Sequence, residues 1–323
     1  MSKFLHGVEV LEIDTGPRPI QTVRSGVIGI VGTAPDAEGA AAATLIIGNA
    51  PSNTGITFTA LQPGTAGNNI RVTFVDPGEP SADWDFRAEG DTVIIGLTTD
   101  LDGAINATAE SLVGVLSALD GFQLPDGSTL PVSVTLSEGS TGKGILRAQS
   151  YVNLSGGAAE PFPFNRPTLI AGSRAEAARL GTAGTLPKAM DGIFDQVGAV
   201  VVVIRVQEGA DEAVTMANII GGVNSATGQM EGVQALLAAE SVVGFSPRIL
   251  CAPGFTHQRE SGQRNAAVAE LLGIAERLRA IIVADGPNTT DDAAQQYAQD
   301  FGSARVYLVD PWPTVIQSDG SYA

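Results

Sequence analysis

The stretch PRILCAPGFTHQRESGQRNAAVAELLGIAERLRAIIVADGP, residues 247–287, decides how this chain folds. It opens with a short apolar run at 248–252 and closes with another at 280–284, and Gly and Pro turns end both runs. Strand, helix and strand in this order predict a βαβ crossover joining two parallel strands with right-handed sense. The helix is predicted from apolar residues at three- and four-residue intervals, namely Val268, Leu271, Leu272, Ala275 and Leu278.

The sequence around this unit continues the alternation of strands and helices. The run GAVVVVIRV at 198–206 is apolar on both faces, which predicts a central strand. The whole pattern predicts an α/β fold, α+β overall, with a three-layer and mainly parallel sheet domain. Further strands are expected at 27–31 and 305–309, and helices at 173–181, 187–197, 212–220, 231–239 and 291–301.

A segment of different texture interrupts this pattern. Short β-rich runs at 56–61, 70–75, 93–97 and 132–136 are separated by Gly, Pro, Asn and Asp turns, with one helix expected at 104–119. Because strand and helix material of the larger domain flanks it on both sides, the segment is predicted to be a small β-rich inserted domain whose ends lie close together. The expected division is an N-terminal arm at 1–24, a core α/β domain at 25–40 and 158–323, and the insert at 41–157.

Composition restricts the partners. The 323 residues carry a formal net charge of -17, which opposes both a nucleic-acid backbone and an anionic membrane, so neither is expected as a partner. The single cysteine, Cys251, rules out an internal disulfide and favours a reducing compartment. The residues before Phe4 do not form a charged and then apolar leader, so no targeting segment is expected, and no apolar run approaches the ~20 residues that span a bilayer.

Reactive groups are sought at the carboxyl ends of the strands, where ligands of open α/β sheets bind. Cys251 with His257 would be a nucleophile and base, but no third group is placed to orient the imidazole, so a buried thiol and a loop histidine are favoured. A metal site at Asp285, Asp291 and Asp292 competes with helix capping, in which Thr290 is the N-cap. Capping is favoured, and the sequence predicts no catalytic residue, no cofactor and no metal.

Two glycine-rich stretches imitate nucleotide-binding loops. The segment 139–144, GSTGKG, has Ser137 where a phosphate loop has its first glycine and Gly144 where it has a hydroxyl residue. The segment 25–35, SGVIGIVGTAP, leads to Pro35 and an Ala-rich stretch rather than directly into a helix. Both are therefore predicted to be structural.

The N-terminal segment offers a different kind of site. Apolar residues point to both faces of an extended chain before a Pro-rich spacer, which is compatible with an edge strand of the chain's own sheet or with an arm that adds a strand to another sheet. The residues of this candidate partner-binding arm are Val8, Val10, Leu11, Ile13, Pro17, Arg18 and Pro19.

Several stretches resemble the tail sheath proteins of contractile bacteriophage tails and related bacteriocins. They are FLHGVEVLEIDTGPRPIQTVRSGVIGIVGTAP, SRAEAARLGTAGTLPKAMDGIFDQVGAVVVVIRV, PRILCAPGFTH, AELLGIAERLRAIIVADGPNTT and ARVYLVDPW, within residues 1–35 and 162–313. The inserted segment is similar, more weakly, to the variable outward-facing insertions of some sheath proteins.

The resemblance implies a structural protein of the virion tail, assembled in the bacterial host cytoplasm, and not an enzyme. Its subunits stack as hexameric rings around an inner tail tube, exchange arms with neighbouring subunits, and contract when the baseplate triggers them. Partners implied in this way are other sheath subunits, the tube protein and the baseplate. The arm at 1–24 then becomes the expected partner-binding site.

One departure and two alternatives accompany the resemblance. Sheath proteins continue past the strand at 305–309 into a C-terminal domain that accepts the arm, so this chain, ending at Ala323, is expected to be a truncated and monomeric form. The insert at 41–157 could instead serve as a carbohydrate- or receptor-binding module. The remaining alternative is an enzyme of the α/β class that uses Cys251 or Asp285.

Overall fold

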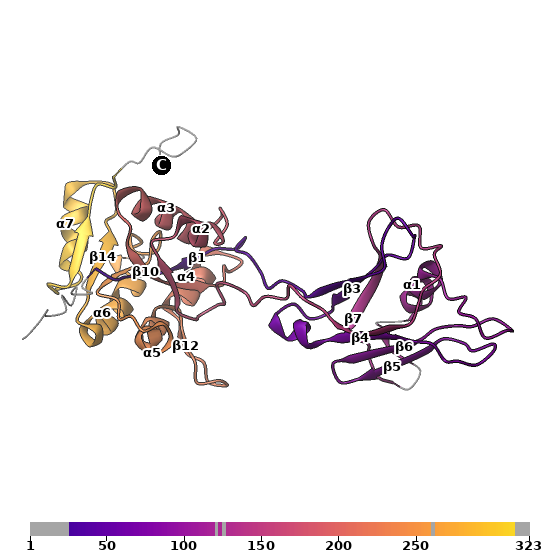
Figure 1. Ribbon diagram of the computed structural model, residues 1–323. Coiled ribbons are helices and arrows are strands. Elements are labelled where there is room, and N and C mark those ends of the chain that lie inside the picture. The colour runs from indigo at the N-terminus through magenta and orange to yellow at the C-terminus, as the bar shows by residue number, and fades with distance from the viewer. Residues whose placement is uncertain (1–25, 120–121, 125–126, 260–261, 314–323) are drawn as a thin grey trace, which may run out of the picture.

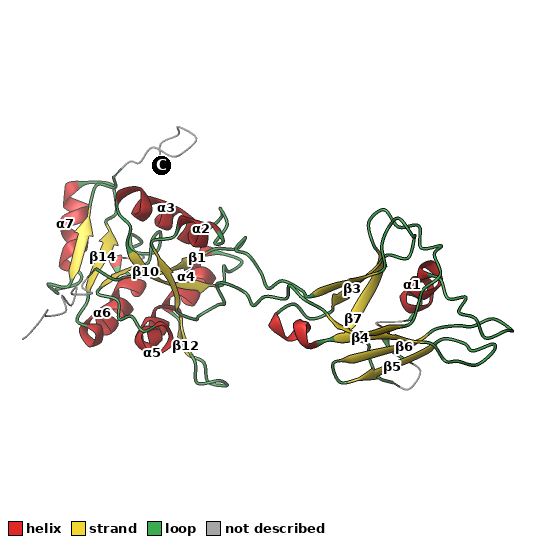
Figure 2. Cartoon of the chain, viewed as in Figure 1, coloured by secondary structure: helices red, strands yellow, loops and turns green. Residues whose placement is uncertain are grey.

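The computed structural model describes residues 26–119, 122–124, 127–259 and 262–313 (Figure 1). Two lobes lie side by side, one with helices around a mostly parallel sheet and the other rich in strands (Figure 2). Two chain segments connect them. None of the helices in these ranges combines the length and apolar character that crossing a bilayer requires. The candidate arm, residues Val8 to Pro19, lies outside the described residues.

A six-stranded sheet forms the larger lobe, and it confirms the predicted α/β class. All neighbouring strands are parallel except the antiparallel edge strand β9. The predicted βαβ unit is present, because β13 and β14 are parallel neighbours joined through α6. In spatial order the strands are β15 (Val306–Val309), β14 (Ile281–Asp285), β13 (Ile249–Cys251), β1 (Ile28–Thr33), β10 (Val200–Val206) and β9 (Thr168–Ala171).

Helices cover both faces of this sheet, as the alternation of side chains along each strand requires. Val31 of β1 packs with the helices of one face, whereas Ile30 packs with α2 and α3 on the other. The second face is covered less completely, since Ile281 is 46% exposed and Tyr307 is 67% exposed. The helices are α2 (Arg174–Ala178), α3 (Leu186–Gln196), α4 (Glu212–Ile220), the 3-10 helix η3 (Gly232–Ala238), α5 (Ala239–Val243), α6 (Ala266–Leu278) and α7 (Asp291–Gln299).

The second lobe has a hydrophobic core of its own, in which Phe58, Leu112 and Leu130 are fully buried. One sheet contains β2 (Thr44–Ile47), β3 (Ile56–Ala60) and β7 (Val132–Leu136). The other contains β5 (Asp85–Glu89), β6 (Thr92–Gly96), β4 (Arg71–Val75) and β8 (Gln149–Asn153). The lobe also holds η1 (Thr65–Asn69) and α1 (Ala109–Ser117).

The two connecting segments pair where they enter and leave this lobe. Ala41 and Ala158 exchange backbone hydrogen bonds of 2.9 and 3.1 Å, and Thr44 pairs in the same way with Ser155. This proximity is what an insertion requires. The domain boundaries at 24, 40 and 157 nevertheless stay a prediction.

Two predicted helices differ from the structure. The helix expected at 104–119 begins only at Ala109, because Thr108 caps it and Ile105 pairs with Thr99 in an isolated bridge. The helix expected at 231–239 is instead a short strand followed by η3 and α5. That strand, β12 (Met230–Glu231), pairs with β11 (Gly222–Val223) in a small hairpin that turns the chain before η3.

Candidate functional site: the strand ends and the lobe junction

Asp285, at the end of β14, is bonded to a neighbouring loop. The Thr256 hydroxyl donates to Asp285 Oδ2 at 3.0 Å and accepts from the Asp285 backbone N–H at 2.9 Å. The Tyr297 hydroxyl in turn donates to the backbone carbonyl of Thr256. Asp285 therefore joins β14 to the loop that follows β13, which is a structural task.

Cys251 and His257 do not form a reactive pair. Cys251 is the last residue of β13, and burial, with a smaller contribution from the Asp285 charge, raises the pKa of its thiol to about 12. Its Sγ lies 3.9 Å from the backbone carbonyl of Gly29, and the His257 ring lies edge-on to Trp312 with 4.9 Å between ring centroids. A thiol with this pKa is almost entirely protonated at neutral pH and is a poor nucleophile.

The acidic residues after β14 cap a helix, as predicted. The Thr290 side chain accepts from the Ala293 N–H at 3.2 Å, and Asp291 and Asp292 follow in the first turn of α7. Negative charge there is favoured by the helix dipole. Within the described ranges, no group of three His, Cys, Asp or Glu side chains is arranged to hold a metal ion.

Asp310, just beyond β15, also binds its own chain. Its Oδ2 accepts from the Asn288 N–H at 2.8 Å, while Trp312 Nε1 donates to the carbonyl of Gly286 at 2.7 Å. These bonds hold the loop after β14 against the segment after β15. The polar groups at the strand ends thus connect loops to one another.

The glycine-rich loop at 139–144 packs against the start of α1. Its carbonyls at Gly142 and Gly144 accept from the N–H groups of Glu110 and Ala109, at 2.8 and 3.4 Å. Free N–H groups at a helix start are what a phosphate group would need. Since the loop's own carbonyls already occupy them, the structure explains this glycine-rich segment as a turn.

Arg205 is the residue that the sequence analysis missed. It lies on β10 with only 6% of its side chain exposed, and its Nη1 donates to Glu160 Oε1 at 2.6 Å and to the carbonyl of Phe162 at 3.1 Å. Its Nε donates to the carbonyl of Ala34 at 2.9 Å. One guanidinium group therefore holds both segments that lead to the β-rich lobe, and the signal in the sequence was a single charge inside the apolar run at 198–206.

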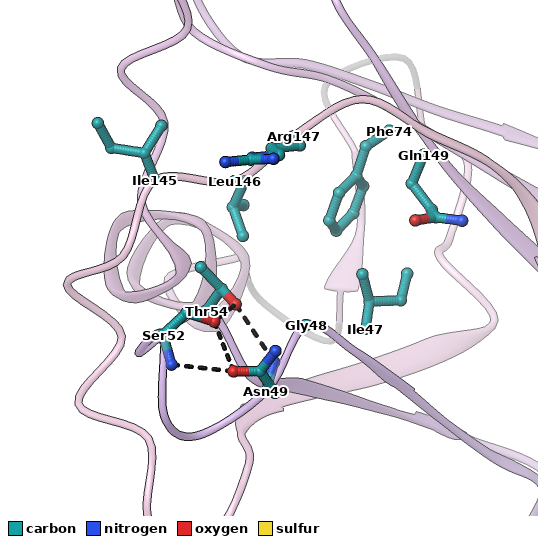
Figure 3. A pocket seen from close by; sticks show the side chains of 10 residues that line it. All are labelled: Ile47, Gly48, Asn49, Ser52, Thr54, Phe74, Ile145, Leu146, Arg147 and Gln149. Atoms are coloured by element: carbon teal, nitrogen blue, oxygen red, sulfur yellow. Dashed lines mark hydrogen bonds between the residues drawn. The ribbon is translucent and has the colours of Figure 1, made fainter.

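A hollow of about 760 Å³ opens in the β-rich lobe between the β2–β3 turn and the segment leading into β8 (Figure 3). Asn49 lies on one side of it, where its Oδ1 accepts from the Ser52 N–H at 2.9 Å, and Arg147 and Gln149 lie on the other. The hollow combines apolar walls with amide, hydroxyl and guanidinium groups. Its lining includes Ile47, Phe74, Ile145 and Leu146.

These features define a class of protein before any comparison. The strand-end side chains bind their own loops, the thiol is protonated, and a buried arginine fixes the base of a second lobe. In each case the group has a structural task, which is the pattern of a structural protein.

Comparison with known proteins agrees with this class. Residues 147–206 match the family model described as the tail sheath protein Gp18 domain III N-terminal region. The chain is 39% identical over 147 residues to a prophage major tail sheath protein of Pseudomonas aeruginosa strain UCBPP-PA14, a match that covers 46% of this chain and 36% of that protein. It is 36% identical over 169 residues to the tail sheath protein of Escherichia phage P2, covering 50% of this chain and 40% of that protein.

A third relative matches over most of the chain. The tail sheath protein of Burkholderia phage BcepMu is 29% identical over 313 residues, which is 88% of this chain and 49% of that protein. The chain thus spans half or less of the length of the curated relatives it matches. By these matches it is a homologue of phage tail sheath proteins, which are structural proteins, and the enzyme alternative at Cys251 or Asp285 is set aside.

Proposed function

We propose that the chain is a structural subunit of a contractile tail sheath. Its copies polymerise as stacked hexameric rings around the tail tube and contract to drive the tube through the host envelope. The similarity to a tail sheath protein over 88% of the chain carries this proposal. The virion tail is its location, and assembly takes place in the bacterial cytoplasm.

The structure of the larger lobe supports a role as a rigid body. Contraction moves whole subunits between two lattices, and this requires units that keep their shape while their contacts change. The parallel sheet with buried helices on both faces meets this requirement. The tube and the baseplate are the other partners in this proposal, because the tube sets the inner surface and the baseplate starts the transition.

The N-terminal arm is the proposed site of exchange between subunits. Deleting residues 1–23 from the complete gene product should abolish polymerisation and leave a folded subunit, because strand addition supplies main-chain hydrogen bonds between copies. Negative-stain electron microscopy of the purified product, alone and with its tube protein, measures the outcome. Tubes of normal length from the deletion variant would contradict the arm proposal.

Two double variants distinguish the loss of apolar side chains in the arm from a mere change of its charge. Val8→Glu with Val10→Glu should prevent polymerisation, since both side chains would be buried in the acceptor sheet. Thr15→Glu with Gln21→Glu makes the same change of charge in the same segment and should leave polymerisation intact. Equal behaviour of the two variants would argue against strand addition.

A second candidate function is favoured by the hollow in the β-rich lobe. We propose as the alternative that residues 41–157 bind a carbohydrate or receptor, since amides and hydroxyls beside apolar walls suit a saccharide. A glycan array probed with the whole chain tests this. Binding that is lost in Asn49→Ala with Gln149→Ala, and kept in Glu89→Ala outside the hollow, would support it, whereas an array without signal would reject it.

A further inference from the structure

Four arginine side chains gather at the amino ends of three neighbouring strands. Arg248 directly precedes β13, Arg305 directly precedes β15, and Arg277 and Arg279 lie at the end of α6, just before β14. Because these strands are parallel neighbours, their amino ends lie at one edge of the sheet (Figure 1). We call these four residues the basic edge.

Two of these four arginines bind backbone carbonyls at the C-terminal end of α6. Arg248 Nη1 donates to the carbonyl of Leu278, and Arg305 Nη1 donates to that of Ala280 at 3.0 Å. Positive charge at a helix C-terminus is favoured by the dipole, so these contacts have a structural reason. They also bring two guanidinium groups to the turn that carries Arg279.

The other two arginines make no such contacts, although Arg277 in the last turn of α6 is also favoured by the helix dipole. Arg277 and Arg279 are exposed, and in the described part of the chain neither side chain makes an ion pair or a hydrogen bond. The only carboxylate in the last turn of α6 is the exposed Glu276. A surplus of positive charge on a chain of net charge -17 marks a surface suited to an anionic partner.

The opposite ends of the same strands carry negative charge. Asp285 ends β14, Asp310 follows β15, and Asp291 and Asp292 open α7. Asp291 and Asp292 are exposed, with no partner for their side chains among the described residues. We call these four residues the acidic edge; one exposed basic residue among the described residues near this end is Arg264, beside the α6 N-cap.

We propose that the basic edge of one copy docks against the acidic edge of a second copy, head to tail along the strand direction. The inference rests on the proposed sheath function and names the faces through which subunits meet. A contact between two different faces of the same protein repeats from copy to copy, which is what a stack requires. The charges of the two edges are complementary, whereas nucleic acid would face the repulsion of the whole chain.

Charge reversal and its rescue test the contact. Sedimentation velocity at about 50 mM and about 500 mM salt should show a chain that is monomeric at low concentration, as the sequence predicts, and that self-associates weakly at high concentration. This association should fall as salt screens the edges. Arg277→Glu with Arg279→Glu should weaken association at least about tenfold, and so should Asp291→Arg with Asp292→Arg. An equimolar mixture of the two variants should associate again, because each supplies the face that the other lacks.

Controls separate this contact from net charge and from misfolding. Lys143→Glu with Arg166→Glu makes the same change of net charge at exposed basic residues away from the basic edge, and should associate as the unaltered chain does. Circular dichroism melts verify folding, and Thr290 still caps α7 in the aspartate variant. A mixture that fails to associate, a control that weakens equally, or an unaltered chain that stays monomeric at every concentration would overturn the inference.

The same variants distinguish failure of the contact from failure of the function. In the complete gene product viewed by negative stain, reversed edges should prevent tubes. Normal tubes from both reversed variants would overturn the edge contact and leave the proposed function standing. An unaltered gene product that forms no tubes with its tube protein would instead overturn the function.

Discussion

Arg205 carries a buried positive charge, and its hydrogen-bond partners lie in the chain segments that precede and follow the β-rich lobe. A buried cation is costly unless its hydrogen bonds are complete, and here Ala34, Glu160 and Phe162 accept from it. The Phe164 ring lies beneath it, with 4.2 Å between Cζ and the ring centroid. Arg205 thus stabilises the core of the larger lobe and fixes the two segments that lead to the β-rich lobe.

Arg205→Met should lower the free energy of unfolding by about 2–4 kcal/mol, because it leaves buried carbonyls and the Glu160 carboxylate without their donor. Urea denaturation of the whole chain measures the change. Arg174→Met is the matched control, since it breaks an exposed ion pair with Asp195 and should cost only about 0–1 kcal/mol. Equal losses from both variants would contradict the anchoring role.

Cys251 gives a prediction that depends on pH. Its thiol pKa rises from 9.0 to about 12 on folding, so at pH 8 the folded chain should hold about a thousandfold less thiolate than the unfolded chain. Alkylation by iodoacetamide, followed by mass spectrometry, should be slower in the native state by a comparable factor. Rapid modification of the folded protein would contradict the raised pKa of this partly buried thiol.

The sign of the linked stability change follows from the same shift. Because the folded pKa lies above the unfolded one, the neutral thiol's contribution is complete below pH 9 and is lost as pH rises toward 12. Cys251→Ala should therefore remove part of the alkaline destabilisation. Between pH 8 and pH 11, the melting temperature of the Cys251→Ala variant should decline less steeply than that of the unaltered chain.

At the scale of elements, strand β1 is sandwiched so closely that its glycines have no room for a side chain. A Cβ on Gly29 would lie 2.9 Å from side-chain atoms of Leu236 and Pro247, and one on Gly32 would lie 2.4 Å from Thr185 Oγ1. The two glycines face opposite sides of the sheet, as neighbours three apart on a strand must. They permit η3 and α3 to approach β1 from its two faces.

Gly29→Ala should destabilise the fold by about 1–3 kcal/mol through overpacking. Gly26→Ala is the matched control, because no atom lies within 4 Å of its added Cβ and the change should be nearly neutral. Thermal unfolding of both variants measures the difference. A tolerated alanine at Gly29 would mean that η3 shifts away from the sheet at little cost.

The strand that contains these glycines could be predicted from the sequence, but the reason for the glycines could not. The apolar run at 25–35 correctly predicted a strand, and the segment that follows it leads to β2 rather than directly into a helix. The reason for the glycines lies in helices more than 150 residues away in sequence, so no local pattern could reveal it. The helix expected at 231–239 failed similarly, because its apolar spacing suits a 3-10 helix as well as an α-helix.

The contacts of the strand-end residues also include some that could be predicted from the sequence and some that could not. Thr290 as a helix cap could be predicted because capping depends on neighbours three residues apart. The pairing of Thr256 with Asp285, and of Arg205 with Ala34 and Glu160, spans 29 to 171 residues and becomes visible only in the folded chain. Helix capping between near neighbours can be predicted from the sequence, whereas hydrogen bonds between distant segments cannot.

At the scale of the whole molecule, the two lobes have separate hydrophobic cores. The cluster around Phe58 and Leu112 draws all its members from residues 43–154, while the clusters around Val31 and Ile30 draw theirs from the rest of the chain. The linking segments are already paired at Ala41 and Ala158. Each lobe therefore contains the apolar contacts it needs to fold alone, which is the physical content of the proposed insertion.

Replacing residues 45–154 by Asn-Gly should leave a folded core, because Thr44 and Ser155 already face one another as an antiparallel pair and a two-residue turn can join them. The excised lobe, expressed as residues 41–158, should fold independently, with a cooperative melt and a dispersed NMR spectrum. Arg205→Met, introduced into the shortened core, should still destabilise it, since Ala34, Glu160 and Phe162 all remain. A core that unfolds without the lobe would show that the two share one cooperative unit, and the proposed boundaries at 40 and 157 would then be wrong.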